Sequence, residues 1–331
     1  MQIDLPLVFM GLMGLAILAY VILDGFDLGV GTLVPFATRD EQDLMVASIG
    51  PFWDANETWL VLGVGILLVA FPLAHGIILS SLYLPVALML IGLILRGVAF
   101  EFRVKASGWH KELWNRLFSV GSLVAGFAQG VMLAGVITGF APGPGFVLFD
   151  LLVGAGLAGA YALLGATWLV LKTEGDLHAR ALRWSKAAVL LALAGVAAIS
   201  VASPFASAGI MQKWFEWPRL LWLAPLPLGT AAAFVGIWRS LTRLQSGQST
   251  REWLPFVLSV WVFVFAFAGL AYSLFPYLVV DRMTIWQAAA APESLRFVFV
   301  GVCFVLPLIV AYTVFAYRVF WGKARSLTYA E

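Results

Sequence analysis

The chain has 331 residues, of which 62% are hydrophobic and only 11% are charged, whereas a soluble globular protein carries ~25% charged residues. One soluble core could not hide so many apolar side chains, so the composition excludes an ordinary soluble enzyme, a nucleic-acid-binding protein and a disordered linker. The mean hydropathy of +0.95 indicates an integral membrane protein. The single cysteine, Cys303, lies in an apolar run, so it provides no disulfide framework and no cysteine-based metal site.

Apolar segments long enough to cross a membrane recur along the whole chain, because a transmembrane helix needs ~20 mostly apolar residues. We predict nine spans, which are roughly Leu5–Val34, Trp53–Phe71, Ile77–Leu95, Leu117–Phe140, Phe146–Leu171, Ala187–Ser203, Leu220–Trp238, Leu254–Phe275 and Leu295–Phe320. The pattern therefore predicts an all-α polytopic membrane protein that forms a single integral membrane domain.

Basic residues are concentrated in alternate loops. The segments that follow the first, third, fifth, seventh and ninth spans carry sixteen of the 20 Lys and Arg residues, including Arg325 in the C-terminal tail. The other loops carry only Lys213, Arg219, Arg282 and Arg296. Because cytoplasmic loops of membrane proteins are enriched in Lys and Arg, the richer side is predicted to be cytoplasmic. The N-terminus is then outside and the C-terminus is cytoplasmic.

Four acidic residues lie within the apolar spans, where lipid should exclude them. Asp24 and Asp27 belong to the first span, and Asp54 and Glu57 to the start of the second. Four unpaired carboxylates inside a bilayer would cost roughly 10 kcal/mol. At ~1.5 Å per residue, they lie about 5–15 Å below the cytoplasmic surface, and a spacing of three residues puts each pair on one helix face. We therefore predict that two neighbouring helices present four acids to one patch.

Three interpretations of this patch remain open. Asp54 could cap the N-terminus of the second span, which explains one acid of the four. The acids could be paired structurally, for example with Arg96, although Arg96, Glu101 and Arg103 are more simply interpreted as interfacial residues at the end of the third span. The third interpretation is a water-filled inlet for protons or cations, the usual role of intramembrane carboxyls. The clustering favours the inlet over capping.

Small residues recur at helical spacing within the spans. Gly25 and Gly29 are four residues apart in the first span, and Gly126 and Gly130 repeat the spacing in the fourth. Such spacings allow two transmembrane helices to approach closely, although glycine is also frequent in membrane helices that make no such contact. We predict that Gly25 and Gly29 mark a contact between helices.

Residues 24–31, DGFDLGVG, and residues 48–60, SIGPFWDANETWL, are the most distinctive segments. Both resemble signature segments of subunit II of cytochrome bd-type quinol oxidases. The similarity continues in order and spacing through residues 70–72, 81–83 and 96–103, and covers roughly the first third of the chain. The short loops resemble those of the compact, cyanide-insensitive branch.

The resemblance implies a heterodimer with a heme-bearing subunit I, which carries b-type and d-type hemes, oxidises quinol and reduces O2 to water. This chain would ligate no heme and no metal. It would fold as two four-helix bundles plus one extra helix, over about residues 5–140, 146–275 and 295–320, in a bacterial inner membrane. The resemblance also allows a small single-span subunit, contacts with membrane lipids and a bound structural quinone or lipid. It implies no nucleic-acid partner.

Two groups of residues receive expected roles from the resemblance. A cytoplasmic proton path would include the acids Asp54, Asp24 and Asp27, with Glu57 beside them. Other residues of the matched segments would have structural or interface roles, namely Trp53, Asn56, Arg96, Glu101 and Arg103. No catalytic residue is expected in this chain.

Two other functions are compatible with the residues. An ion-coupled secondary transporter could use the four acids to couple an ion to a substrate, although transporters usually have a midplane site and inverted repeats. A purely structural membrane partner could have its acids neutralised by another subunit, without any role in proton transfer.

Overall fold

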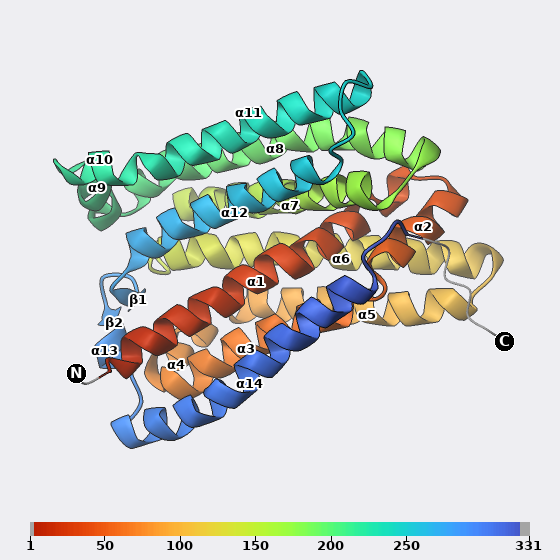
Figure 1. Cartoon of the computed structure of the whole chain (residues 1–331). Helices are drawn as coiled ribbons and strands as arrows, with labels where there is room; N and C mark the ends of the chain where they lie inside the picture. Colours follow the sequence, from red (N-terminus) through yellow and green to blue (C-terminus); the bar gives the residue numbers. More distant parts are fainter. Residues whose placement is uncertain (1–2, 325–331) are drawn as a thin grey trace.

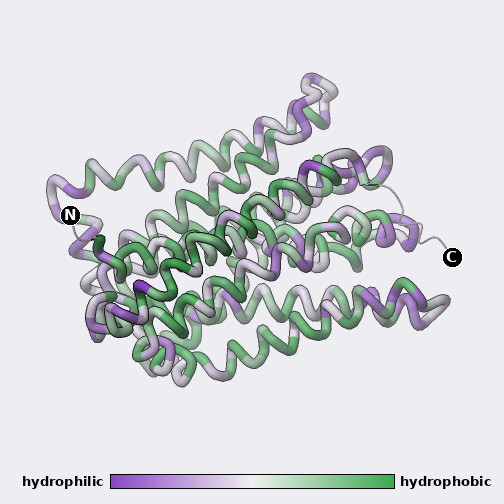
Figure 2. Tube along the Cα trace, turned by 60° about the horizontal axis from the view of Figure 1, so that its bottom comes forward, coloured by the Kyte–Doolittle hydropathy of each residue, from purple (hydrophilic) through white to green (hydrophobic). Residues whose placement is uncertain are grey.

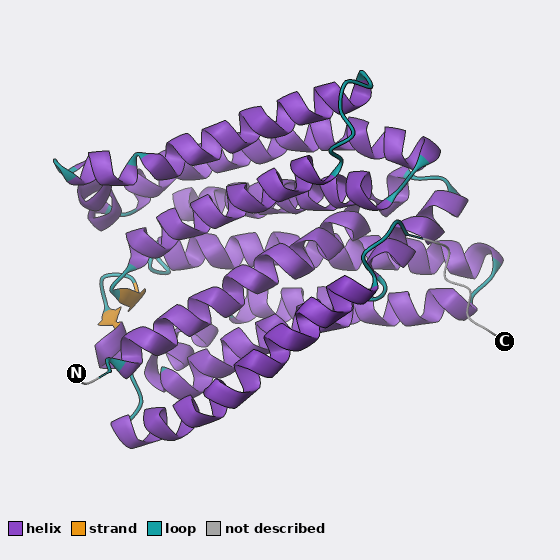
Figure 3. Cartoon of the chain, in the orientation of Figure 1, coloured by secondary structure: helices purple, strands orange, loops and turns teal. Residues whose placement is uncertain are grey.

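The computed structural model describes residues 3–324, and long helices that run alongside one another make up almost all of this region (Figures 1 and 3). Nine helices in this described region are long and apolar enough to cross a membrane, which confirms the predicted number of spans. Hydrophobic residues extend along the helices, and hydrophilic residues gather mainly at their ends (Figure 2). Arg325, counted above in the basic tail, lies outside the described residues.

The chain begins and ends with a long helix. The first elements are α1 (Leu5–Leu33), the 3₁₀ helix η1 (Val34–Phe36), α2 (Arg39–Ile49), α3 (Trp53–Ala70), α4 (Pro72–Ser81), α5 (Tyr83–Lys105), α6 (Gly108–Ile137) and α7 (Pro144–Lys172). The remaining elements are α8 (Gly175–Ala206), α9 (Ala208–Phe215), α10 (Arg219–Leu223), α11 (Pro225–Gln245), α12 (Trp253–Leu274), β1 (Tyr277–Val279), β2 (Met283–Thr284), α13 (Ile285–Ala288) and α14 (Pro292–Val319). The two short strands form an antiparallel pair.

The segments rich in basic residues lie at the same end of the molecule. Helix α2, the turns α5–α6, α7–α8 and α11–α12, and the C-terminal end of α14 are all found there (Figure 1). The N-terminus lies at the opposite end, together with α9, α10 and the strand pair (Figure 1). The segments rich in Lys and Arg therefore lie at one end of the molecule, as the predicted orientation requires.

The third span differs from its predicted position, because a short helix precedes it. Residues Ile77–Leu95 were expected to form one span, but they are divided between α4 and α5. Pro72 begins α4, and Pro85 lies in the first turn of α5. A proline is tolerated in a first turn because its missing N–H would have had no partner there. As α5 then continues to Lys105, Arg96 lies well inside the helix.

Helix α1 packs against α3, α6 and α7. A Cβ atom at Gly29 would overlap the backbone carbonyl of Tyr161 on α7, and one at Gly165 would overlap the backbone of Gly29. Gly25 faces the ring of Tyr161. The backbones of α1 and α7 are therefore in direct contact. The division into two four-helix bundles and one extra helix stays a prediction.

Two lysines fasten the C-terminal end of α14 to the rest of the bundle. Lys172 Nζ, at the end of α7, donates to the carbonyls of Phe320 (2.8 Å) and Gly322 (2.9 Å). From the segment after α14, Lys323 Nζ donates to the carbonyl of Thr173 (2.9 Å) and forms an ion pair with Glu252. We refer to these six residues as the C-terminal clasp.

We predict that Lys172→Met weakens the clasp and destabilises the protein by about 2 kcal/mol, because a charged group then no longer satisfies two carbonyl oxygens. A lower melting temperature of the purified protein, together with faster proteolysis after α14, is the expected measurement. Lys105→Met, at an exposed position at the end of α5, is the control and should melt like the parent. Equal melting of both variants would show that the clasp contributes no stability.

Candidate functional site

Asp24 and Asp27 are completely buried within α1. Asp24 forms an ion pair with Arg96 of α5, in which Arg96 Nη1 lies 2.7 Å from Asp24 Oδ1. Arg96 is only 1% exposed and lies about 14 Å from the end of α5 at ~1.5 Å per residue. The interpretation of Arg96 as an interfacial anchor is therefore wrong, because α5 continues nine residues beyond it to Lys105. Its guanidinium instead neutralises a buried acid.

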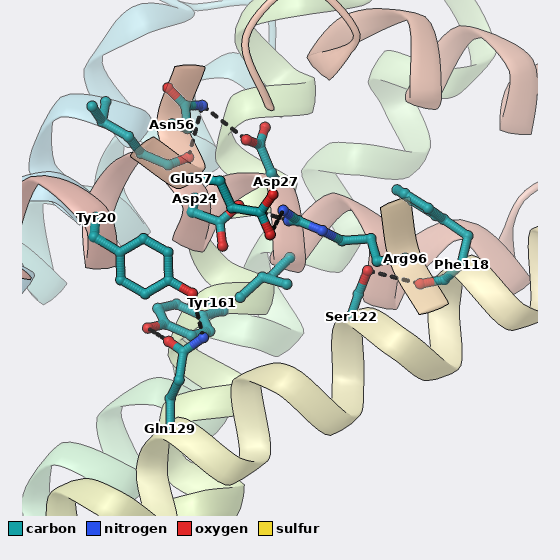
Figure 4. A network of polar contacts seen from close by, with 12 residues as sticks. Tyr20, Asp24, Asp27, Asn56, Glu57, Arg96, Phe118, Ser122, Gln129 and Tyr161 are labelled. Atoms are coloured by element: carbon teal, nitrogen blue, oxygen red, sulfur yellow. Dashed lines mark hydrogen bonds and ion pairs between the residues drawn. The ribbon is translucent and has the colours of Figure 1, made fainter. Parts of the chain in front are cut away.

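Glu57 of α3 is the second carboxylate on the same guanidinium. Its Oε1 lies 3.3 Å from Arg96 Nη2, and its side chain is 26% exposed. The three charged groups, Glu57, Arg96 and Asp24, come from three different helices and form one cluster (Figure 4). This cluster leads from a partly exposed carboxylate to a fully buried one.

Asp27 is bound by an amide. Asn56 of α3 donates its Nδ2 hydrogens to Asp27 Oδ2 at 2.8 Å and to the carbonyl oxygen of Leu23 at 3.2 Å. On its other side, Asn56 Oδ1 accepts a hydrogen bond from the Tyr317 hydroxyl of α14 at 3.0 Å. Asp27 Oδ1 is buried and has no hydrogen-bond partner among the described residues. Only one of the two carboxylate oxygens of Asp27 therefore has a hydrogen-bond partner among the described residues.

Three polar residues that the sequence patterns did not single out extend further into the bundle from Asp24. Tyr20 lies one turn before Asp24 on α1, and its hydroxyl accepts a hydrogen bond from Gln129 Nε2 of α6 at 2.8 Å. Gln129 Oε1 accepts one from the Tyr161 hydroxyl of α7 at 2.6 Å (Figure 4). All three are buried. The presence of Gln129 within an apolar span was the signal that could have identified them.

Asp54 is the one predicted acid that is exposed. Helix α3 begins at Trp53 with Phe52 as its N-cap, so Asp54 lies in the first turn. The interpretation of Asp54 as the N-cap is therefore wrong, although a carboxylate in a first turn still interacts favourably with the helix dipole. Asp54 and Glu57 are three residues apart on α3, which puts them on one face with Asp54 nearer the helix end.

The other residues of the matched segments have separate environments. The Trp53 ring lies 5.8 Å from the Arg96 guanidinium carbon, close enough for a cation–π contact. Arg103 Nε donates to Asn115 Oδ1 at 2.8 Å, and its Nη2 lies 2.7 Å from Asp43 Oδ1, so it joins α5 to α6 and α2. Glu101 is exposed.

The sequence matches the family model for cytochrome bd terminal oxidase subunit II over residues 5–320. The chain belongs to the cytochrome bd terminal oxidase subunit II family. It is therefore a subunit of a bd-type oxidase, which is an oxidoreductase complex. The chain is also a multi-pass bacterial membrane protein.

Similar proteins span nearly the same length. Cytochrome bd-I ubiquinol oxidase subunit 2 of Escherichia coli strain K12 is 27% identical, with 94% of this chain and 93% of that protein aligned. Cytochrome bd ubiquinol oxidase subunit 2 of Bacillus subtilis strain 168 is also 27% identical, over 93% and 94%. A chain of the bd oxidase structure from Geobacillus thermodenitrificans has the same fold, with a TM-score of 0.75, 18% identity, and 97% of this chain and 100% of that chain covered.

Membership of the cytochrome bd family implies that the oxidase complex contains hemes. Within residues 3–324, no group of three or more His, Cys, Asp or Glu side chains is arranged to hold a metal ion. The histidines His75, His110 and His178 lie on three different helices, α4, α6 and α8.

Proposed function

We propose that this chain is the heme-free subunit II of a bd-type quinol oxidase. In this proposal, a partner subunit I carries the b-type and d-type hemes, oxidises quinol and reduces O2 to water. The present chain stabilises that subunit and provides a cytoplasmic inlet for the protons that O2 reduction consumes. Taking those protons from the cytoplasm makes the reaction electrogenic.

The cluster Glu57–Arg96–Asp24 is the observation that supports the inlet most directly. Glu57 is partly exposed and would exchange protons with water at the inlet, whereas Asp24 is fully buried. Arg96 contacts both carboxylates and compensates for the cost of their negative charge inside the protein. Asp54 would lie at the mouth of the inlet, next to Glu57, and Asp27 would lie in the interior, next to Asp24.

Membrane placement is also part of the proposal. The end of the molecule that is rich in Lys and Arg faces the cytoplasm, so the N-terminus is outside, and the membrane is the bacterial inner membrane. We further propose that the complex is a heterodimer of the compact, cyanide-insensitive branch, which can also bind a small single-span subunit and a structural quinone or lipid.

A purely structural role for the acids is the second candidate, since the pairing of Asp24 with Arg96 favours it. Breaking a buried ion pair is strongly destabilising whether or not the pair transfers protons. Membership of the oxidase family favours both of these candidates over an ion-coupled transporter.

The inlet is tested by replacing its outer carboxyls with amides of the same shape. We expect Glu57→Gln to slow quinol-driven oxygen uptake by the purified oxidase by ~10-fold or more, because a positioned proton-transfer group typically contributes at least that much. Asp54→Asn should cause a smaller loss. Heme absorption should be unchanged in both variants, since the amide of Glu57→Gln can still accept a hydrogen bond from Arg96 and Asp54 is exposed.

Asp150→Asn is the matched control, because Asp150 is a partly buried carboxyl near the start of α7 and far from the cluster in sequence. It should leave oxygen uptake unchanged. Normal turnover of both Glu57→Gln and Asp54→Asn would reject the inlet, and loss of heme together with turnover would support the structural role. If the protein purified without any heme-bearing partner, the proposed pairing with subunit I would be rejected as well.

A further inference from the structure

Helix α14 makes a hydrogen bond to the site through Tyr317, near its C-terminal end. None of its most apolar 18-residue window is buried within the protein, yet the Tyr317 ring is stacked on Phe52 with ring centroids 4.5 Å apart. The same ring also makes edge contacts with Phe26 and Trp168. Tyr317 is therefore held firmly in the core, although it belongs to a largely exposed helix.

The C-terminal clasp maintains this position. Lys172 binds the carbonyls of Phe320 and Gly322, which follow Tyr317 within a few residues. The Phe320 ring also packs edge-on against Phe52, at 6.0 Å between centroids. The hydrogen bonds from Lys172 and the packing of Phe320 on Phe52 thus restrict how far the Tyr317 hydroxyl can move from Asn56.

The Asn56 amide links Tyr317 to Asp27 in a directional way. An amide has a donor side, Nδ2, and an acceptor side, Oδ1. The Tyr317 hydroxyl donates to Oδ1, so Nδ2 faces α1, where it donates to Asp27 and to the carbonyl of Leu23. If the amide were turned by 180°, its oxygen would face Asp27, which could form a hydrogen bond only in its protonated form.

We propose that Tyr317 is a positioning residue of the proton inlet, which holds the Asn56 amide in the orientation that stabilises Asp27 as a carboxylate. A donor hydrogen bond to a carboxylate favours its charged form. Asp27 can then accept a proton on Oδ1, which has no hydrogen-bond partner among the described residues. It can also accept one on Oδ2 when the Asn56 amide turns away. This inference rests on the inlet proposed above.

Other ionisable groups near Asp27 come from several helices. They are Asp24 of α1, Glu57 of α3 and Arg96 of α5, with Tyr20 of α1 and Tyr161 of α7 beside Asp24. None of them is changed by a substitution at Tyr317, so a change in the protonation of Asp27 in that variant is attributable to the loss of the hydroxyl.

The test measures the protonation of Asp27 directly in the purified oxidase. Infrared spectroscopy detects the C=O stretch of a protonated carboxyl, and loss of the band in Asp27→Asn assigns it. We expect Tyr317→Phe to increase the protonated fraction of Asp27 severalfold at a given pH and to slow oxygen uptake. Tyr312→Phe removes the same hydroxyl from an exposed site on the same helix and should change neither.

A double-mutant cycle tests whether Tyr317 acts through Asn56. Asn56→Leu removes the hydrogen bond to Asp27 and the one from Tyr317, so adding Tyr317→Phe to it should have no further effect on the Asp27 band. A further change would contradict the proposal, and so would an unchanged band in Tyr317→Phe, even with slower turnover. If Glu57→Gln and Asp54→Asn turn over normally while Tyr317→Phe still shifts the band, the positioning role stands and the inlet fails.

Discussion

Arg96→Met should cause a large loss of stability, of about 3–5 kcal/mol, since removing one partner of a buried ion pair leaves the other charge uncompensated. Asp24 is completely buried at 2.7 Å from the guanidinium, and Glu57 would lose the same partner. We expect a much lower yield of assembled oxidase, a lower melting temperature and little oxygen uptake.

Two further variants separate charge from shape at this position. Arg96→Lys retains the positive charge but loses the forked geometry that contacts two carboxylates, so it should retain part of the stability. Asp24→Asn combined with Arg96→Met removes both buried charges and should melt at a higher temperature than Arg96→Met alone. If Arg96→Met melted like the parent, the pair would not be stabilising the protein.

Gly29→Ala should also be strongly destabilising, by about 3 kcal/mol, because overpacking a close contact forces the backbone to shift. The added Cβ would overlap the backbone carbonyl of Tyr161, and a carbonyl in a helix cannot rotate out of the way. The α1–α7 contact would open, and Tyr161 would move away from Gln129. Thermal melting and the yield of the purified complex measure the effect.

Gly11→Ala is the matched control, because it makes the same change in the same helix. A Cβ at Gly11 would have nothing within 4 Å, so this variant should be as stable as the parent or slightly more stable, since alanine favours a helix more than glycine does. Similar melting temperatures for the two variants would rule out a tight contact at Gly29.

The positions of the apolar spans could be predicted well because a helix that crosses lipid must be apolar along its own length. The third span was the exception. Its predicted range, Ile77–Leu95, followed hydropathy alone and crossed the break between α4 and α5. As a result, Arg96 was assigned to the interface. Pro85 was the sequence signal for the later start, since proline is well tolerated in a first turn.

The candidate site was predicted in part. The acids were recognised because each one is exceptional in an apolar segment, and Asp24 and Glu57 do share a partner. Arg96 is one possible partner in the sequence, but the sequence favours an interfacial role for it, because Arg96 is 72 residues from Asp24 along the chain and nothing local links the two. Tyr317, which contacts Asn56, is more distant still, and a tyrosine near the end of a span is typical of an interfacial belt in any membrane protein.

The sequence by itself determined the class of protein, the number of its spans, the side that carries the basic residues and the acids that lipid should exclude. These properties follow from the composition of each segment, because a segment enters a bilayer according to its own hydrophobicity. Only the tertiary structure decided the environment of each acid. Asp24 is paired with a buried arginine, Asp27 is bound to an amide, and Asp54 is exposed. The physical reason is that a buried charge is stabilised by groups on neighbouring helices, and which faces of those helices meet depends on packing across the whole bundle.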